Sequence, residues 1–106
     1  MKTINVVVID AEKQTVEDRT IPKTLEALQK IVGGYIEKAG EVVEEDLYVN
    51  EEGLLNGTKV GFMLPWIQQP LMGNGVIVGH DDDGGSKSTE LRAEAIAPLI
   101  RWGVVR

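Results

Sequence analysis

Two adjacent glycines, Gly33 and Gly34, separate two periodic patterns in the first half of the chain. Before them, apolar residues recur at the three- and four-residue spacing of one helix face: Leu25, Leu28, Ile31 and Val32. After them, an alternating pattern typical of a strand begins at Tyr35. Glycine readily adopts the left-handed conformation that ends many helices, so Gly33 is the expected C-cap residue. The chain must therefore fold with a helix that leads directly into a strand.

The residues before this helix are predicted to form two strands. Residues 4–9 are β-branched and nearly continuous, which is typical of a strand buried on both faces. A polar loop follows, and then residues 15–20 carry the charges that are typical of a strand at a sheet edge. Thr24 is the expected N-cap, and Glu26 lies in the first helical turn, where the helix dipole favours an anion.

The second half of the chain predicts more strands and one further helix. Residues 46–50 and 75–80 read as strands, and residues 50–53 form a turn that would pair Leu54 and Leu55 back onto Tyr48 and Val49. Thr89 is the expected cap of a final helix whose apolar face runs from Leu91 to Trp102 and which is kinked or broken at Pro98.

These elements predict a single small α+β domain. Its sheet is mostly antiparallel and twisted, in the order β-β-α-β-β-β-β, with one helix packed on it and a C-terminal helix. A chain of 106 residues is long enough to bury roughly 60–68% of its unfolded surface in one core. We expect one compact domain over residues 1–106, with a core in residues 1–83 and a C-terminal helix and tail in residues 86–106.

The composition narrows the classes of protein that fit this chain. Cysteine is absent, which excludes disulfides, thiolate nucleophiles and cysteine-based zinc sites. With 11 Lys and Arg against 17 Asp and Glu, the net charge of −6 argues against binding to nucleic acid. The apolar run near the N-terminus is too short for a signal peptide or a membrane span. We therefore expect a cytoplasmic protein with no membrane partner.

The segment of residues 56–73 combines breaks in regular structure with many apolar residues. Glycines and prolines interrupt it, so no long helix or strand is predicted. Its apolar residues are Phe62, Met63, Leu64, Trp66, Ile67, Leu71 and Met72. Three readings stay open: packing under the sheet, a surface for an oligomer or a partner, and a lid over a ligand.

Several features could carry chemistry, and each also has a structural reading. The glycines of residues 73–79 have the wrong spacing and position for a dinucleotide-binding loop. The residues from His80 to Asp83 read as a solvated turn, and binding of a divalent cation stays open as the alternative. The acids among residues 37–46 offer carboxylates whose separation the sequence does not fix. We expect no catalytic residues, no metal ligands, no cofactor and no enzyme activity.

Three motifs, in this order, resemble a known family. They are IVGGYIE at residues 31–37, LYVNEEGLLNG at 47–57 and GNGVIVG at 73–79, and the opening VVVID at 6–10 matches as well. Over residues 4–83 the chain resembles a small domain of unknown function that is common in bacteriophages, prophages, plasmids and other mobile elements. The segment from 58 to 72 departs from that family and is more apolar.

The resemblance supplies no catalytic residues, but it implies a genomic context. Small accessory proteins of mobile elements often counter host defence. The first hypothesis is a non-enzymatic protein that sequesters a small nucleotide signal, of the cyclic nucleotide or ADP-ribose type, in a pocket that could lie between subunits of a homo-oligomer. Backbone amides would bind phosphate, aromatic rings would stack the base, and cations would add charge. The candidate ligand-binding residues are Gly33, Gly34, Tyr35, Tyr48, Asn50, Lys59, Trp66, Asn74 and Arg92.

The alternative hypothesis is an inhibitor or adaptor that binds a host protein. Such a protein would block a defence component or a target of host takeover through its apolar 62–72 surface. Large aromatic side chains often supply much of the energy of such interfaces, although core packing is the simpler reading of both tryptophans. The candidate partner-binding residues are Phe62, Met63, Pro65, Trp66, Ile67 and Trp102.

Overall fold

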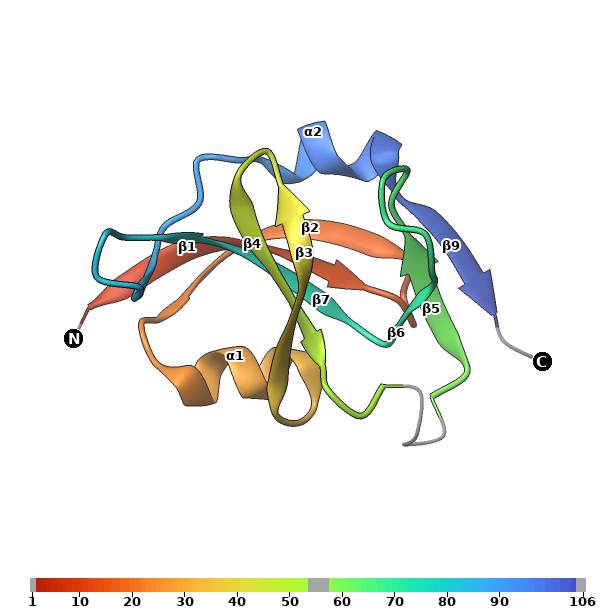
Figure 1. Cartoon of the computed structure of the whole chain (residues 1–106), viewed down its shortest axis with the longest axis horizontal. Coiled ribbons are helices and arrows are strands. Elements are labelled where there is room, and N and C mark those ends of the chain that lie inside the picture. The colour runs from red at the N-terminus through yellow and green to blue at the C-terminus, as the bar shows by residue number, and fades with distance from the viewer. Residues whose placement is uncertain (1, 54–57, 105–106) are drawn as a thin grey trace.

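The computed structural model describes residues 2–53 and 58–104, and within them two antiparallel sheets and two α-helices confirm the α+β class (Figure 1). The main sheet has the strand order β2-β1-β7-β4-β3, and β8 pairs with the end of β7. Its strands are β1 (Thr3–Asp10), β2 (Thr15–Pro22), β3 (Ile36–Val42), β4 (Glu45–Asn50), β7 (Gly75–His80) and β8 (Ser86–Lys87). The second sheet has the order β6-β5-β9, and its strands are β5 (Val60–Met63), β6 (Leu71–Met72) and β9 (Arg101–Val104).

The main sheet carries a hydrophobic cluster on each face. Helix α1 (Leu25–Val32) covers one face, while α2 (Ala93–Ile96) lies on the opposite side (Figure 1). The α1 side holds Ile4, Val6, Val8, Leu28, Val32, Val76 and Val78. The other cluster joins the main sheet to α2 and the second sheet, and includes Val7, Leu47, Ile77, Phe62, Leu64, Leu71 and Ile96. The alternation of side chains along each strand explains this division, because neighbouring residues such as Val7 and Val8 face opposite sides.

The first half of the chain folds as its sequence predicts. Strand β1 is an interior strand and β2 is an edge strand. The Thr24 hydroxyl accepts a hydrogen bond from the Ala27 amide at 3.1 Å, and Gly33 ends α1 in the left-handed conformation with φ 81°. One expectation about the apolar face of α1 is wrong. Leu25, the first residue of α1, is 53% exposed, whereas Leu28 and Val32 are buried.

The region around residues 50–53 confirms the predicted turn, since the Gly53 amide donates to the Asn50 carbonyl at 3.1 Å. The expected pairing of Leu54 and Leu55 with β4 lies outside the described residues. On its two sides β4 pairs with β3 and β7.

The second sheet was not predicted, because its sequence contains the residues that normally interrupt strands. Gly61 in β5 is the clearest example: a Cβ atom there would lie 2.4 Å from the Leu71 carbonyl oxygen of β6. Glycine is therefore what permits the two strands to approach.

A C-terminal helix is present, but it is shorter than predicted and does not reach Trp102. Helix α2 has four residues and begins at Ala93, whose amide donates to the Asp18 carboxylate at 2.8 Å. A short 3-10 helix follows at Ala97–Leu99 and contains Pro98, which cannot continue an α-helical ladder. Trp102 then lies in β9, opposite Phe62 of β5. In the ranges 2–53 and 58–104, no helix has the length and apolar character needed to cross a membrane.

Candidate functional site

A hollow of about 320 Å³ lies at the C-terminal end of α1, and we call it the Tyr35 hollow. It brings together part of the predicted ligand set, and its lining is Gln29, Gly33, Gly34, Tyr35, Asn50, Glu51 and Glu52. The Tyr35 side chain is 68% exposed at its border, so the phenol ring is accessible for stacking.

The polar groups of this hollow mainly serve to close the helix. The amides of Gly33 and Gly34 both donate to the Gln29 carbonyl, at 2.8 and 3.1 Å. The Asn50 side-chain amide donates to the Val32 carbonyl at 3.2 Å. The two glycine amides predicted to bind phosphate therefore already have a partner. Two carboxylates and the negative end of the helix dipole also make the hollow unfavourable for an anion.

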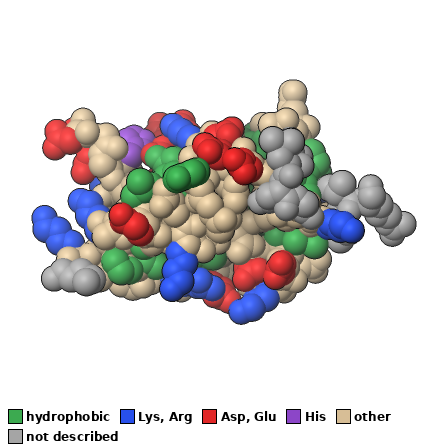
Figure 2. All heavy atoms as spheres, turned by 90° about the horizontal axis from the view of Figure 1, so that it is seen from below, with side chains coloured by type: hydrophobic (Ala, Val, Ile, Leu, Met, Phe, Trp, Pro, Cys, Tyr) green, Lys and Arg blue, Asp and Glu red, His purple; other side chains and the backbone are tan. Residues whose placement is uncertain are grey.

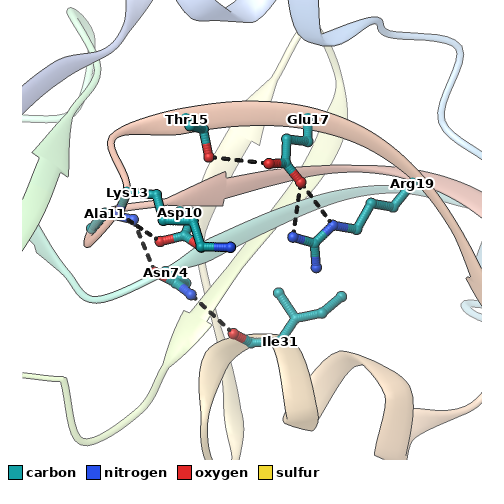
Figure 3. A network of polar contacts seen from close by, with 8 residues as sticks. All are labelled: Asp10, Ala11, Lys13, Thr15, Glu17, Arg19, Ile31 and Asn74. Atoms are coloured by element: carbon teal, nitrogen blue, oxygen red, sulfur yellow. Dashed lines mark hydrogen bonds and ion pairs between the residues drawn. The ribbon is translucent and has the colours of Figure 1, made fainter.

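The other predicted ligand residues lie elsewhere in the fold. Asn74 also secures the helix end: its side-chain oxygen accepts from the Ala11 amide at 2.9 Å, and its amide group donates to the Ile31 carbonyl at 3.4 Å (Figure 3). Arg92 lines a separate hollow of about 380 Å³ between β2 and residues 89–92. Lys59 is exposed beside β5.

Figure 3 also shows an exposed ion pair on β2. The Arg19 guanidinium donates to the Glu17 carboxylate at 2.9 and 3.1 Å. These hydrogen bonds and the positive charge of Arg19 lower the pKa of the Glu17 carboxyl. Arg19 is thus already paired.

Figure 2 shows basic side chains interspersed with acidic ones on the side of the molecule that is seen from below.

A second polar site, which the sequence did not predict, is centred on Asp46 of β4. The Asp46 residue is 6% exposed, and its Oδ1 atom lies 3.1 Å from Lys38 Nζ and 3.4 Å from His80 Nδ1. Tyr48 donates from its hydroxyl to Asp46 Oδ2 at 3.4 Å. Lys38 Nζ also contacts the Glu41 carboxylate at 3.2 Å. Strands β3, β4 and β7 bring these groups together, and the spacing of the residues in the sequence does not show that they meet.

The acidic partners in this cluster affect the pKa values of two of its members. The adjacent Asp46 carboxylate and, next, the hydrogen bond to Glu41 raise the pKa of the Lys38 ammonium group. Burial and, next, the negative charge of Asp46 raise the pKa of the Tyr48 phenol. Asp46 Oδ1 itself accepts no hydrogen bond of good geometry, although the Lys38 and His80 nitrogens lie close to it. The cluster therefore holds a buried carboxylate mainly by charge.

The turn after His80 uses its first aspartate internally. The Asp81 carboxylate accepts from the amides of Asp83 and Gly85, at 3.0 and 2.8 Å. Within residues 2–53 and 58–104, no group of three or more His, Asp or Glu side chains is placed to hold a metal ion.

The apolar 62–72 segment is part core and part surface. Phe62 is 1% exposed, so its prediction as a partner-binding residue is wrong: its position in β5 points the ring into the core between the sheets. Ile67 and Trp102 are half-buried and pack against the same core. Met63, Pro65 and Trp66 are exposed, and we call these three residues the Trp66 surface.

Trp66 is fixed in place despite its exposure. Trp66 is 48% exposed, yet its indole Nε1–H donates to the Glu41 carbonyl of β3 at 2.9 Å. Its neighbour Ile67 lies against Gly40, where a Cβ atom would come within 3.3 Å of Ile67 Cδ1. The loop that carries the Trp66 surface is thus docked on the edge strand β3.

Comparison with known proteins gives a family but no characterised relative. No curated protein and no solved structure is significantly similar to the chain. A family model described as a domain of unknown function, DUF3846, matches residues 1–101, which extends beyond the stretch that carries the sequence motifs. The chain therefore belongs to the DUF3846 family.

Proposed function

We propose that this protein is a non-enzymatic binding module that recognises another protein through the Trp66 surface. The observation that supports this proposal is the indole of Trp66, which is half exposed and already held by a hydrogen bond to the β3 backbone. A fixed aromatic ring loses little conformational freedom on binding. Tryptophan is also among the residues that most often dominate the energy of an interface.

The wider context of this proposal rests on the family resemblance. We propose an accessory protein of a phage or other mobile element, acting in the cytoplasm of the host cell. Its target would be a host defence component or a protein involved in host takeover.

Affinity capture from a bacterial lysate tests the proposal with a matched pair of variants. Trp66→Ser removes the exposed indole, whereas Leu25→Ser removes an equally exposed apolar side chain at the start of α1. We expect the wild-type protein and Leu25→Ser to capture the same protein and Trp66→Ser to lose at least ~90% of it, as the loss of a hot-spot side chain predicts. Equal capture by all three proteins would contradict the proposal.

A second candidate is the sequestration of a small nucleotide signal at the Tyr35 hollow. It is favoured by one observation: four of the predicted ligand residues, Gly33, Gly34, Tyr35 and Asn50, line the same hollow. It ranks second because the carboxylates of Glu51 and Glu52 border that hollow. A nucleotide would have to stack its base on Tyr35 and keep its phosphates outside.

Native mass spectrometry with cyclic nucleotides and ADP-ribose derivatives tests this second candidate. Sequestration predicts a retained ligand that is released intact on heating, and loss of binding in Tyr35→Ala. The mass of the unliganded protein also gives the number of subunits. Absence of any complex at micromolar concentrations would contradict nucleotide binding.

A further inference from the structure

We infer that the partner presents an extended, basic segment that pairs with the edge strand β3 and so adds a strand to the main sheet. This inference rests on the proposed function, because it assigns a chemistry to the partner of the Trp66 surface. Strand addition uses backbone hydrogen bonds for affinity and side-chain contacts for specificity.

Strand β3 is one of the two edge strands of the main sheet. The sheet order ends at β3, whose described strand partner is β4. Within residues 2–53 and 58–104 no strand pairs with its outer side, so outer backbone groups other than the Glu41 carbonyl can pair with a new strand. In this respect β3 differs from an interior strand such as β7, which pairs with β1 on one side and β4 on the other.

Hydrogen bonds at the two ends of β3 show which residues face outward. The Glu51 amide donates to the Tyr35 carbonyl at 3.0 Å, so the Tyr35 carbonyl faces β4. Antiparallel ladders alternate between inward and outward backbone groups, which places the amides and carbonyls of Ile36 and Lys38 on the outer side. A bulge between Lys38 and Gly40 then changes the alternation, and the Glu41 carbonyl faces outward again.

The outer edge of β3 already accepts one hydrogen bond from outside the main sheet. The donor is the indole of Trp66, bonded to the Glu41 carbonyl at 2.9 Å. This contact occupies the edge at Glu41, on the C-terminal side of Lys38. A segment paired with Ile36 and Lys38 would therefore run alongside the Trp66 loop.

A groove next to this edge has room for side chains of the added segment. Its volume is about 380 Å³, and it lies between the ends of β3 and β4 on one side and the chain from Gln69 to Met72 on the other. Ala39 and Pro70 contribute apolar lining, while Glu37 and Glu51 contribute carboxylates.

The charges around the groove favour a basic occupant. Glu37 and Glu51 are exposed, and both line the groove. The nearby cation, Lys38, is held by the carboxylates of Glu41 and Asp46, at 3.2 and 3.1 Å. Among the described residues, neither carboxylate has an ion-pair partner, and the net charge of −6 of the whole chain attracts a basic segment further.

The opposite edge of the main sheet, β2, fits this role less well. Pro22 cannot donate a backbone hydrogen bond there. Arg19 and Glu17 form an ion pair on that strand, and Asp18 is bonded to the Ala93 amide of α2. Both carboxylates of β2 are therefore already engaged, and they are less available to a basic segment than Glu37 of β3.

A designed peptide tests the inference with the intact protein. The probe is a capped peptide of alternating Lys and Val, about seven residues long, and the controls are a Glu–Val peptide and the Lys–Val peptide with N-methyl groups on its strand-facing amides. We expect NMR titration of ¹⁵N-labelled protein to shift the amides of Ile36, Glu37 and Lys38. The Lys–Val peptide should bind at least ~10-fold more tightly than the Glu–Val peptide. Its binding should weaken with added salt, as charge complementarity predicts. N-methylation should abolish binding.

A pair of double variants tests the role of charge. The double variant Glu37→Gln with Glu51→Gln should bind the Lys–Val peptide several-fold more weakly. The control Glu26→Gln with Glu94→Gln changes the net charge equally at other exposed sites and should have a small effect on this binding. Three results would overturn the inference: no binding at millimolar concentration, shifts confined to other strands, or undiminished binding of the N-methylated peptide. Such a failure leaves the Trp66-dependent capture intact, whereas loss of that capture contradicts the proposed function itself.

Discussion

At the scale of single residues, Gly33 and Gly34 have different tasks. Gly33 adopts a left-handed conformation with φ 81°, and apart from its neighbours in the chain no described residue lies within 4 Å of where its Cβ would be. Gly34 provides space instead, since a Cβ there would lie 2.8 Å from the side-chain nitrogen of Asn50. The sequence predicts the first role from the helix pattern. The second depends on Asn50, which a strand far along the chain brings to the helix end.

The conformation of Gly33 leads to the first prediction. Gly33→Ala should lower the free energy of unfolding by about 1–2 kcal/mol, because a Cβ atom disfavours the left-handed region. Gly33→Asn should lose less, because asparagine tolerates that conformation. Urea unfolding followed by circular dichroism measures both changes. Equal losses in the two variants would show that conformational strain is not the cause.

Tyr48 leads to a prediction about alkaline pH. Burial and the nearby Asp46 carboxylate raise the pKa of its phenol, so the folded protein holds the neutral form more strongly than the unfolded chain does. This contribution to stability is complete below pH ~10, the ordinary tyrosine value, and is lost as the pH rises through the higher value of the folded state. In Tyr35→Phe, absorbance at the phenolate band reports on Tyr48 alone. A midpoint at or below that of a model tyrosine peptide would contradict the Asp46 geometry.

At the scale of elements, the success of sequence prediction follows the strength of the local pattern. Strands β1 and β7 are runs of β-branched residues, and α1 is flanked by residues typical of helix caps, Thr24 and Gly33. The second sheet and β8 are short and contain or adjoin glycine and proline, so their local signal is weak. The same difference applies to the candidate sites. The Tyr35 hollow lies beside a helix end that the sequence predicts. The Asp46 cluster forms only when three strands pair in the correct register, which the local sequence does not show.

Two glycines in the second sheet provide a matched test of this packing. Gly61 and Gly103 are paired across β5 and β9. A Cβ on Gly61 would meet the Leu71 carbonyl oxygen at 2.4 Å, whereas one on Gly103 would meet no described residue within 4 Å beyond its neighbours in the chain. Gly61→Ala should destabilise the protein by about 1–3 kcal/mol, since backbone must shift to make room. Gly103→Ala should change stability by less than about 0.5 kcal/mol, as is usual for a substitution without a clash. The difference between the two urea midpoints is the measurement, and equal midpoints would contradict the close approach of β5 and β6.

At the scale of the whole molecule, the main sheet connects the two hydrophobic clusters. Residues of β1 and β7 contribute to both clusters through alternate side chains. A substitution that disrupts either hydrophobic cluster should therefore lower the stability of the whole domain, because the same strands contribute to both clusters.

Core truncations on opposite faces test this coupling. Leu28→Ala on the α1 side should cost about 2–5 kcal/mol, and Phe62→Ala on the other side about 3–5 kcal/mol. Each should move a single thermal transition to lower temperature, with near- and far-ultraviolet circular dichroism changing together. Two separate transitions in either variant would mean that the faces fold independently.

Hydrogen exchange measured by mass spectrometry, on the protein alone and with its captured partner, tests the central claim most directly. The account predicts slower exchange of backbone amides on partner binding in residues 36–41 and 63–69, which contain the β3 edge and the Trp66 surface. Protection confined to α1, β2 or the residues around His80, with β3 and the Trp66 loop unchanged, would contradict it.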